Sequence, residues 1–216
     1  MSISNKMMMG AGGSTAAPIE YIGGVGFDAD RSSSFSSTSN LNILGTAGVG
    51  DLVIISISGR ANGNDTWSWV GMDFTDIVRG AGSDPFYYVG YKIVESGDTN
   101  PYVTGADWVA FTVTATVFRQ ASVFDAGTSV DTTYPINPPS LTSSSRLWMV
   151  IGGKYATTSL LSTPPSYTLG VSQVRSGQYA SDATSSQFYK IEDLDSDSPS
   201  FPATESSGWA MTLSFS

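Results

Sequence analysis

The chain has 216 residues and contains neither cysteine nor histidine. Disulfides, thiolate chemistry, imidazole metal ligands and Ser-His-Asp triads are therefore excluded. Ten basic residues stand against 19 acidic ones, which gives a formal net charge of −9. Because phosphate binding needs clustered Lys and Arg, and no basic patch interrupts this balance, we expect no nucleic-acid partner. No apolar run approaches the roughly 18 residues of a membrane span, so we expect no membrane insertion.

Residues 1–18 are rich in Gly, Ala and Met and show no usable hydrophobic period. By itself such a segment is an extended arm rather than part of a core. It carries Met7, Met8 and Met9, and methionine side chains adapt well to irregular partner surfaces. We expect this arm to dock on a neighbouring subunit or a larger particle. The alternative is that it folds back on its own domain.

The rest of the chain, residues 19–216, shows the short alternating and apolar runs of an all-β domain. Residues 52–58 carry β-branched side chains on both faces and are expected to lie deep in the fold. Residues 108–118 alternate, which predicts one buried face and one solvent-exposed face carrying Ala110, Thr112, Thr114 and Thr116. No window shows a helical period. The fold class predicted is an antiparallel β-sandwich of jelly-roll type. The further expected strands are 19–25, 74–78, 86–94, 146–151, 166–174, 178–191 and 208–215.

One sequence pattern occurs twice. The first copy runs from Tyr91-Lys92-Ile93 through an acidic turn and Pro101 to Trp108, and the second runs from Tyr189-Lys190-Ile191 through an acidic turn and Pro199 to Trp209. An apolar run precedes each copy at a similar distance. We interpret the chain as two half-repeats, about 45–119 and 145–216, within one domain. The alternative is chance similarity between two β-rich halves.

The second acidic turn has the Asp-x-Asp-x-Asp spacing with which a calcium loop begins, in Asp193, Asp195 and Asp197. A helix-flanked calcium loop then needs Gly at its sixth position and Glu at its twelfth. This chain has Ser198 and Thr204 there, so that kind of loop is excluded. A looser calcium site in a β-loop stays open beside the simpler interpretation of a solvated acidic turn. No other cofactor is indicated.

A second candidate site combines Trp67 and Trp69 with their polar neighbours Asn62, Asn64 and Asp65. Two residues apart on an extended chain, the indoles would share one face and could stack on a sugar, whose hydroxyls the polar side chains would bind. The alternative is that the tryptophans fill the core or a subunit interface, where aromatic side chains dominate burial.

Paired carboxylates for glycoside hydrolysis need one acid with a raised pKa. The four glutamates, Glu20, Glu95, Glu192 and Glu205, fall in expected turns or at strand ends, where a raised pKa is not expected. We therefore name no catalytic residue and expect no enzyme.

Several of these segments together resemble small β-sandwich virion proteins of tailed bacteriophages. The resemblance lies in the Gly50-Asp51-Leu52 entry to an apolar strand, the Tyr91-Lys92 strand with its acidic turn, the Thr-alternating run 108–118, and the Met- and Gly-rich segment 6–13. It covers most of the chain, but its motifs are structural, and it carries over no catalytic or binding residue.

This resemblance implies a structural component of a phage particle located on the virion. The favoured role is a tail-associated fibre or host-recognition subunit. Its partners would be copies of itself, preferably in a trimer, other virion proteins and a host surface glycan. The alternatives are a capsid decoration protein and a carbohydrate-binding module without enzymatic activity.

Overall fold

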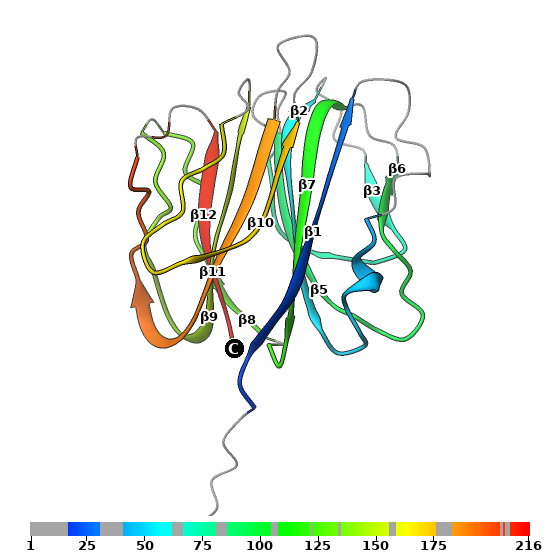
Figure 1. Ribbon diagram of the computed structural model, residues 1–216, viewed down its shortest axis with the longest axis horizontal. Helices are drawn as coiled ribbons and strands as arrows, with labels where there is room; N and C mark the ends of the chain where they lie inside the picture. The colour runs from blue at the N-terminus through cyan, green and yellow to red at the C-terminus, as the bar shows by residue number, and fades with distance from the viewer. Residues whose placement is uncertain are drawn as a thin grey trace, which may run out of the picture.

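The protein is an all-β antiparallel sandwich of two five-stranded sheets (Figure 1). The computed structural model describes residues 17–30, 41–61, 67–80, 86–104, 108–121, 123–133, 135–155, 159–175, 183–203, 205 and 208–216. Within them, no helix is long and apolar enough to cross a membrane. The expected arm residues Met7, Met8 and Met9 lie outside this range, as do Asn62, Asn64 and Asp65.

Sheet 1 has the strand order β1-β7-β2-β5-β4, and sheet 2 has the order β10-β11-β9-β12-β8. A small third sheet pairs β3 (Ser68–Val70) with β6 (Tyr102–Thr104), and a 3-10 helix, η1, spans Ile43–Gly45. The strands of sheet 1 are β1 (Glu20–Asp30), β2 (Leu52–Ala61), β4 (Thr75–Arg79), β5 (Phe86–Ile93) and β7 (Trp108–Arg119). Those of sheet 2 are β8 (Phe124–Gly127), β9 (Leu141–Tyr155), β10 (Thr168–Arg175), β11 (Ala183–Asp197) and β12 (Trp209–Phe215).

The expected sandwich is thus present, whereas the jelly-roll wiring is not confirmed. Sheet 1 takes all of its strands from the first half of the chain, and sheet 2 takes all of its strands from the second half. Apart from the separate β3-β6 pair, consecutive strands therefore stay in one sheet.

The two sheets repeat the same arrangement strand for strand. Replacing β1, β2, β4, β5 and β7 by β8, β9, β10, β11 and β12 turns the order of sheet 1 into the order of sheet 2. The central strand β2 pairs Leu52 with Ile93 on β5 and with Phe118 on β7. The central strand β9 pairs Leu147 with Ile191 on β11 and with Phe215 on β12.

Two irregularities also recur at equivalent places. The register between β1 and β7 shifts directly after the pair Tyr21 and Phe118, and that between β8 and β12 shifts directly after the pair Phe124 and Phe215. The pairings of β4 with β5 and of β10 with β11 each contain one shift, two pairs after their starts at Thr75 and Thr168. Since bulges are specific features rather than defects, four shared pairings with two shared bulges describe one five-stranded unit present twice. The units include β1 and β8, which precede the expected starts at residues 45 and 145.

Three apolar cores lie across the part of the chain that the structure describes. The middle core, between the sheets, contains Leu52 and Ile54 of sheet 1 and Met149, Met211 and Leu213 of sheet 2. An outer core covers the far face of sheet 1 beneath η1 and the β3-β6 pair, and another covers the far face of sheet 2. Both faces of β2 are therefore buried, as its sequence predicts.

The prediction of one wet face for residues 108–118 is wrong. Thr112, Thr114 and Thr116 have no solvent exposure and point into the space between the sheets. Thr114 and Thr116 meet Ser185 and Gln187 of β11, which are also fully buried, and Thr112 donates to the Ser58 carbonyl oxygen of β2. The polar face of another strand gives the threonine hydroxyls the hydrogen bonds that water would otherwise make. Alternation in the sequence therefore does not distinguish a solvent-exposed Thr face from one buried against a polar strand.

Candidate functional site

The expected sugar platform is not formed by its two tryptophans. Trp67 is 3% exposed and packs in the outer core of sheet 1, and its ring meets that of Trp69 edge-on at 85°. The Arg79 guanidinium lies 4.1 Å from the centroid of the Trp67 ring, and its Nη1 donates to the Trp67 carbonyl oxygen at 3.2 Å. The tryptophans therefore fill the core, because large aromatic surfaces gain most from burial.

The expected acidic turn is a strand, because β11 continues through it to Asp197. Two register shifts against β9, on either side of Leu194, bend this part of β11. Each of the three aspartates has a different partner: Asp193 faces Arg146 at 3.5 Å, Asp195 accepts from the Ser144 hydroxyl at 2.5 Å, and Asp197 binds Lys190. Among the described residues no group of three or more acidic side chains could hold a metal ion. The calcium site proposed from Asp193, Asp195 and Asp197 is thus not assembled.

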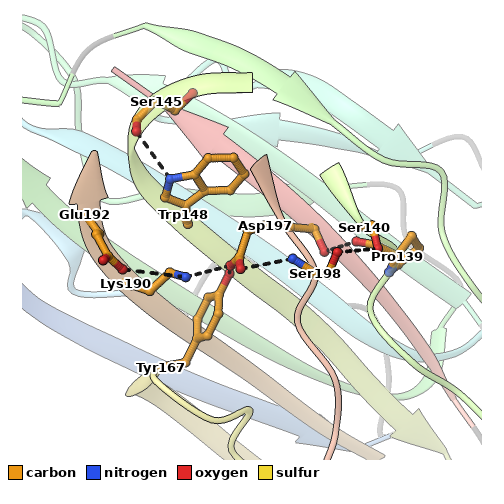
Figure 2. Close-up of polar contacts among 10 residues, drawn as sticks. Pro139, Ser140, Ser145, Trp148, Tyr167, Lys190, Glu192, Asp197 and Ser198 are labelled. Atoms are coloured by element: carbon orange, nitrogen blue, oxygen red, sulfur yellow. Dashed lines mark hydrogen bonds and ion pairs between the residues drawn. The ribbon is translucent and has the colours of Figure 1, made fainter. Parts of the chain in front are cut away.

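Asp197 is committed to a partly buried polar cluster that joins β11 to Tyr167, the residue directly before β10 (Figure 2). Its carboxylate is 2.9 Å from Lys190 Nζ and accepts a short hydrogen bond of 2.5 Å from the Tyr167 hydroxyl. Lys190 also lies 3.8 Å from Glu192 and 5.2 Å from the centroid of the Tyr167 ring. Burial, followed by the hydrogen bond to Asp197, raises the pKa of Tyr167 far above its ordinary value. The cluster therefore fastens the entry of β10 to the end of β11.

Sequence reasoning missed a second buried ion pair, between Lys154 of β9 and Glu205. Both residues are almost fully buried, and the pair is direct. Glu205 Oε1 also accepts from the backbone amide of Ser162 at 2.8 Å and from its hydroxyl at 2.6 Å. Burial opposes the charged form, but the hydrogen bonds from Lys154 and Ser162 outweigh it and lower the pKa of Glu205. This agrees with the expectation that its pKa is not raised, and the carboxylate acts as a structural anchor.

Two shallow hollows lie at the same end of the sandwich, where Leu52 pairs with Phe118 and Leu147 with Phe215; we call it the lower end. Their volumes are about 310 and 300 Å³. The first is lined by Ser144, Ser145, Arg146, Asp193, Leu194 and Asp195. The second is lined by Val49, Gly50, Asp51, Arg119, Gln120 and Ala121.

These hollows occupy related positions, because each includes the residue directly before the equivalent leucine, Leu52 or Leu147, of a central strand. Asp51 directly precedes β2, and Arg146 directly precedes Leu147 at the equivalent place in β9. Asp51 accepts two hydrogen bonds from Arg119, at 3.0 and 3.1 Å, and one from the Gly48 amide. Burial opposes the charged form of Asp51, but these hydrogen bonds outweigh that effect and lower the pKa of its carboxyl group. The polar groups of the second hollow thus bond to one another and fasten the start of β2 to the end of β7.

The C-terminus and the first described residues, which lead into β1, both lie at the lower end (Figure 1). Arg146 Nη2 donates to the Ala17 carbonyl oxygen at 3.2 Å, where the expected arm meets the domain. The C-terminal Ser216 exchanges two backbone hydrogen bonds with Val123, at 2.9 and 3.1 Å. Val49, Val123 and Ile191, all near this end, are 72%, 54% and 40% exposed. The lower end therefore combines the bonded start of the described chain at Ala17 with exposed apolar side chains, and it is the best candidate for a contact surface.

No protein-family model, no curated protein and no solved structure matches the chain.

Proposed function

We propose that this protein is a structural subunit of a tailed-phage particle that acts without catalysis at the tail, where copies associate through the N-terminal arm. The observation that supports this most is the bond from Arg146 to the Ala17 carbonyl, which holds the first described residue to the domain. Exposed Val49 and Val123 lie at the same end. An arm that starts from a fixed point costs less entropy when it docks on a neighbour.

The charged groups of the candidate sites also support a structural role. Asp51, Asp197 and Glu205 each hold two parts of the fold together through paired hydrogen bonds. Groups committed in this way are poorly placed to bind or transform a small substrate. A carbohydrate module built on Trp67 and Trp69 is disfavoured, because Arg79 covers one indole and the other packs against Phe74 and Tyr88.

Light scattering of three full-domain proteins tests this proposal. They are the full chain, a chain lacking residues 1–15 that keeps Ala17 and Pro18, and a full chain with Met7→Ser, Met8→Ser and Met9→Ser. We expect a closed oligomer, preferably a trimer, for the full chain, since closed symmetry is the rule for such assemblies. We expect a monomer for the truncated chain and a weakened oligomer for the methionine variant.

Arg146→Lys serves as a matched variant that keeps the charge but loses the forked guanidinium that reaches Ala17. It should weaken the oligomer less than the truncation does. An oligomer that survives removal of residues 1–15 would contradict assembly through the arm. A full chain that stays monomeric at all accessible concentrations would contradict self-association.

A further inference from the structure

The two copies of the five-stranded unit carry equivalent aromatic clusters at the lower end. Tyr21, Phe118 and Tyr189 form one cluster: the rings of Tyr21 and Tyr189 stack at 4.7 Å and 16°, and those of Phe118 and Tyr189 meet edge-on at 5.4 Å and 76°. The other cluster consists of the equivalent residues Phe124, Phe215 and Tyr91. Its stacked pair, Tyr91 and Phe124, lies at 5.5 Å and 23°, and its edge-on pair, Tyr91 and Phe215, at 5.9 Å and 74°.

Each cluster takes residues from both halves of the chain. Tyr189 of the second half completes the first cluster, and Tyr91 of the first half completes the second cluster. This exchange is what an approximate two-fold rotation between the sheets produces. At the lower end, therefore, the halves meet as two like subunits would.

Above these clusters the inner faces of the two halves differ. The register makes Thr114 and Thr116 of β7 equivalent to Met211 and Leu213 of β12. It likewise makes Tyr87 and Val89 of β5 equivalent to Ser185 and Gln187 of β11. On β2 and β9, Ser56 is equivalent to Ile151. Among these equivalent positions of β5, β7, β11 and β12, the polar residues of the first half lie on β7 and those of the second half lie on β11.

The polar strands face each other. The Thr116 hydroxyl donates to Gln187 Oε1 at 2.6 Å, and Gln187 Nε2 donates to the Thr114 carbonyl oxygen at 2.8 Å. Ser185 Oγ lies 2.9 Å from Thr114 Oγ1 and 3.1 Å from Ser56 Oγ. All five side chains have no solvent exposure. The contact between β7 and β11 is therefore a buried polar zipper whose members come from both halves.

The related contact, between β5 and β12, is apolar. Tyr87 packs on Trp209 with ring centroids 5.5 Å apart, and Val89, Met211 and Leu213 lie in the same middle core. The indole Nε1 of Trp209 donates to Ser58 Oγ at 3.1 Å. Ser58 fits because its partner across the interior is Gly153, where an added Cβ would overlap the Ser58 side chain and the Thr184 carbonyl oxygen.

From this asymmetry we infer that the inner face of each half accepts only the other half of this chain and rejects a second copy of itself. If two first halves paired by the same rotation, Thr114 and Thr116 would face Tyr87 and Val89, and the Thr116 hydroxyl would lose its acceptor. If two second halves paired, the Gln187 amide would be buried against Met211 and Leu213. A buried amide without partners is strongly disfavoured, so the wrong pairings are penalised and the correct one is satisfied.

This property disfavours the pairing of like halves from neighbouring copies. A chain made of two similar halves can close on itself, but where copies are concentrated, as they are in any assembly, its halves also meet the like halves of other chains. Each like pair would link two chains and leave their other halves free to link further chains. The zipper makes that route costly at every copy, whichever particle or complex the protein belongs to, so the inference does not depend on the proposed function.

The test separates the halves without removing either one. A flexible protease site is inserted after Ala121, in the connection between β7 and β8, and the purified chain is cut, unfolded in urea and refolded by dilution. Native mass spectrometry then counts the three pairings, which differ in mass. The uncut insertion chain, refolded in parallel, fixes conditions under which the intact protein recovers.

We expect the mixed pair of first and second half to exceed the two like pairs together by about ten-fold or more, the ratio that one unsatisfied buried group produces. Like pairs in amounts comparable to the mixed pair would overturn the inference. So would failure of the cut halves to reassociate under conditions where the uncut chain refolds, because the inner faces would then not suffice for recognition.

A second chain carries Thr116→Val and Gln187→Leu, which make part of the zipper apolar, and it should form a larger fraction of like pairs. The matched control carries Ser68→Ala and Thr104→Val, which remove an exposed hydroxyl pair between β3 and β6. It should keep the selectivity of the parent. Equal selectivity in the zipper variant and the control would show that the polar residues do not decide the pairing and would overturn the inference.

Discussion

At the scale of single residues, the ion pair between Lys154 and Glu205 shows why a buried charge is compatible with a stable fold only when its hydrogen bonds are all made. Lys154 Nζ donates to the Leu160 carbonyl oxygen at 3.1 Å and to the Ser159 hydroxyl at 3.3 Å, in addition to its ion pair with Glu205. Glu205 in turn holds Ser162. The pair therefore ties the segment 159–162 to β9, at the edge of the outer core around Leu161.

Glu205→Gln should destabilise the protein by about 3–5 kcal/mol at pH 7, because it leaves the Lys154 ammonium buried without a counter-charge. The free energy of unfolding from urea titrations measures this. The matched control is Glu192→Gln, whose carboxylate is 57% exposed and 3.8 Å from Lys190. It should change the stability by less than about 0.5 kcal/mol.

The same substitution predicts a pH dependence. The folded-state pKa of Glu205 is lowered, so the stability it adds is fully present above its unfolded-state pKa, about 4.3, and is lost as the pH falls through the lower folded value. The difference in unfolding free energy between the parent and Glu205→Gln should therefore shrink in acid. A difference that stays constant from pH 7 to pH 3 would contradict the assignment of the lowered pKa to this carboxylate.

At the scale of elements, β7 shows the limit of sequence periodicity. Its alternation correctly predicts a long strand, and Val113, Ala115 and Val117 do share one buried face. The opposite face also alternates, but Ser56, Ser185 and Gln187 replace the water that the threonines would otherwise meet. Which strand lies opposite another is a tertiary fact that the local pattern does not contain.

The repeat motifs are also local patterns, and they mark equivalent positions only where the same residues recur in both halves. Tyr91-Lys92-Ile93 and Tyr189-Lys190-Ile191 occupy equivalent register positions beside the central strands. Trp108 and Trp209 do not, because Phe118 is equivalent to Phe215 and so Trp209 corresponds to Thr112. Neither β1 nor β8 carries a motif that could be aligned by eye, since Tyr21 and Phe124 agree only in being aromatic.

A double-mutant cycle on Thr116 and Gln187 tests whether β7 and β11 are coupled as the zipper requires. Thr116→Val and Gln187→Leu should each cost about 1–3 kcal/mol, because each leaves a buried partner without its hydrogen bond. The double variant should cost less than the sum by about 0.5–3 kcal/mol, the range for residues in one network.

Urea denaturation of the four proteins measures this cycle. A parallel cycle on the exposed pair Ser68 and Thr104 should give coupling near zero, since water replaces the lost bond. Additive effects at Thr116 and Gln187 would mean that the two side chains do not depend on each other.

At the scale of the whole molecule, the two sheets share the middle core, and each half also has an outer core of its own. The outer cores would allow the halves to unfold separately, whereas the shared interior opposes this. Separation would expose Leu52, Ile54, Met149 and Leu213 to water. It would also break the hydrogen bonds between the zipper residues of β7 and β11, so both halves would lose stability together.

We therefore expect β2 and β9 to unfold in one cooperative step. Hydrogen exchange followed by mass spectrometry in increasing urea should bring the amides of both strands onto a single curve with the same free energy of opening, because each exchanges only through global unfolding. The turn at Glu95 to Asp98 serves as the internal control. The hydrogen bond from the Asp98 amide to the Glu95 carbonyl oxygen, 3.2 Å long, lies on the surface and should open locally at much lower free energy. Two separate curves for β2 and β9 would mean that each half is held mainly by its outer core, and that the shared interior joins two independently stable units.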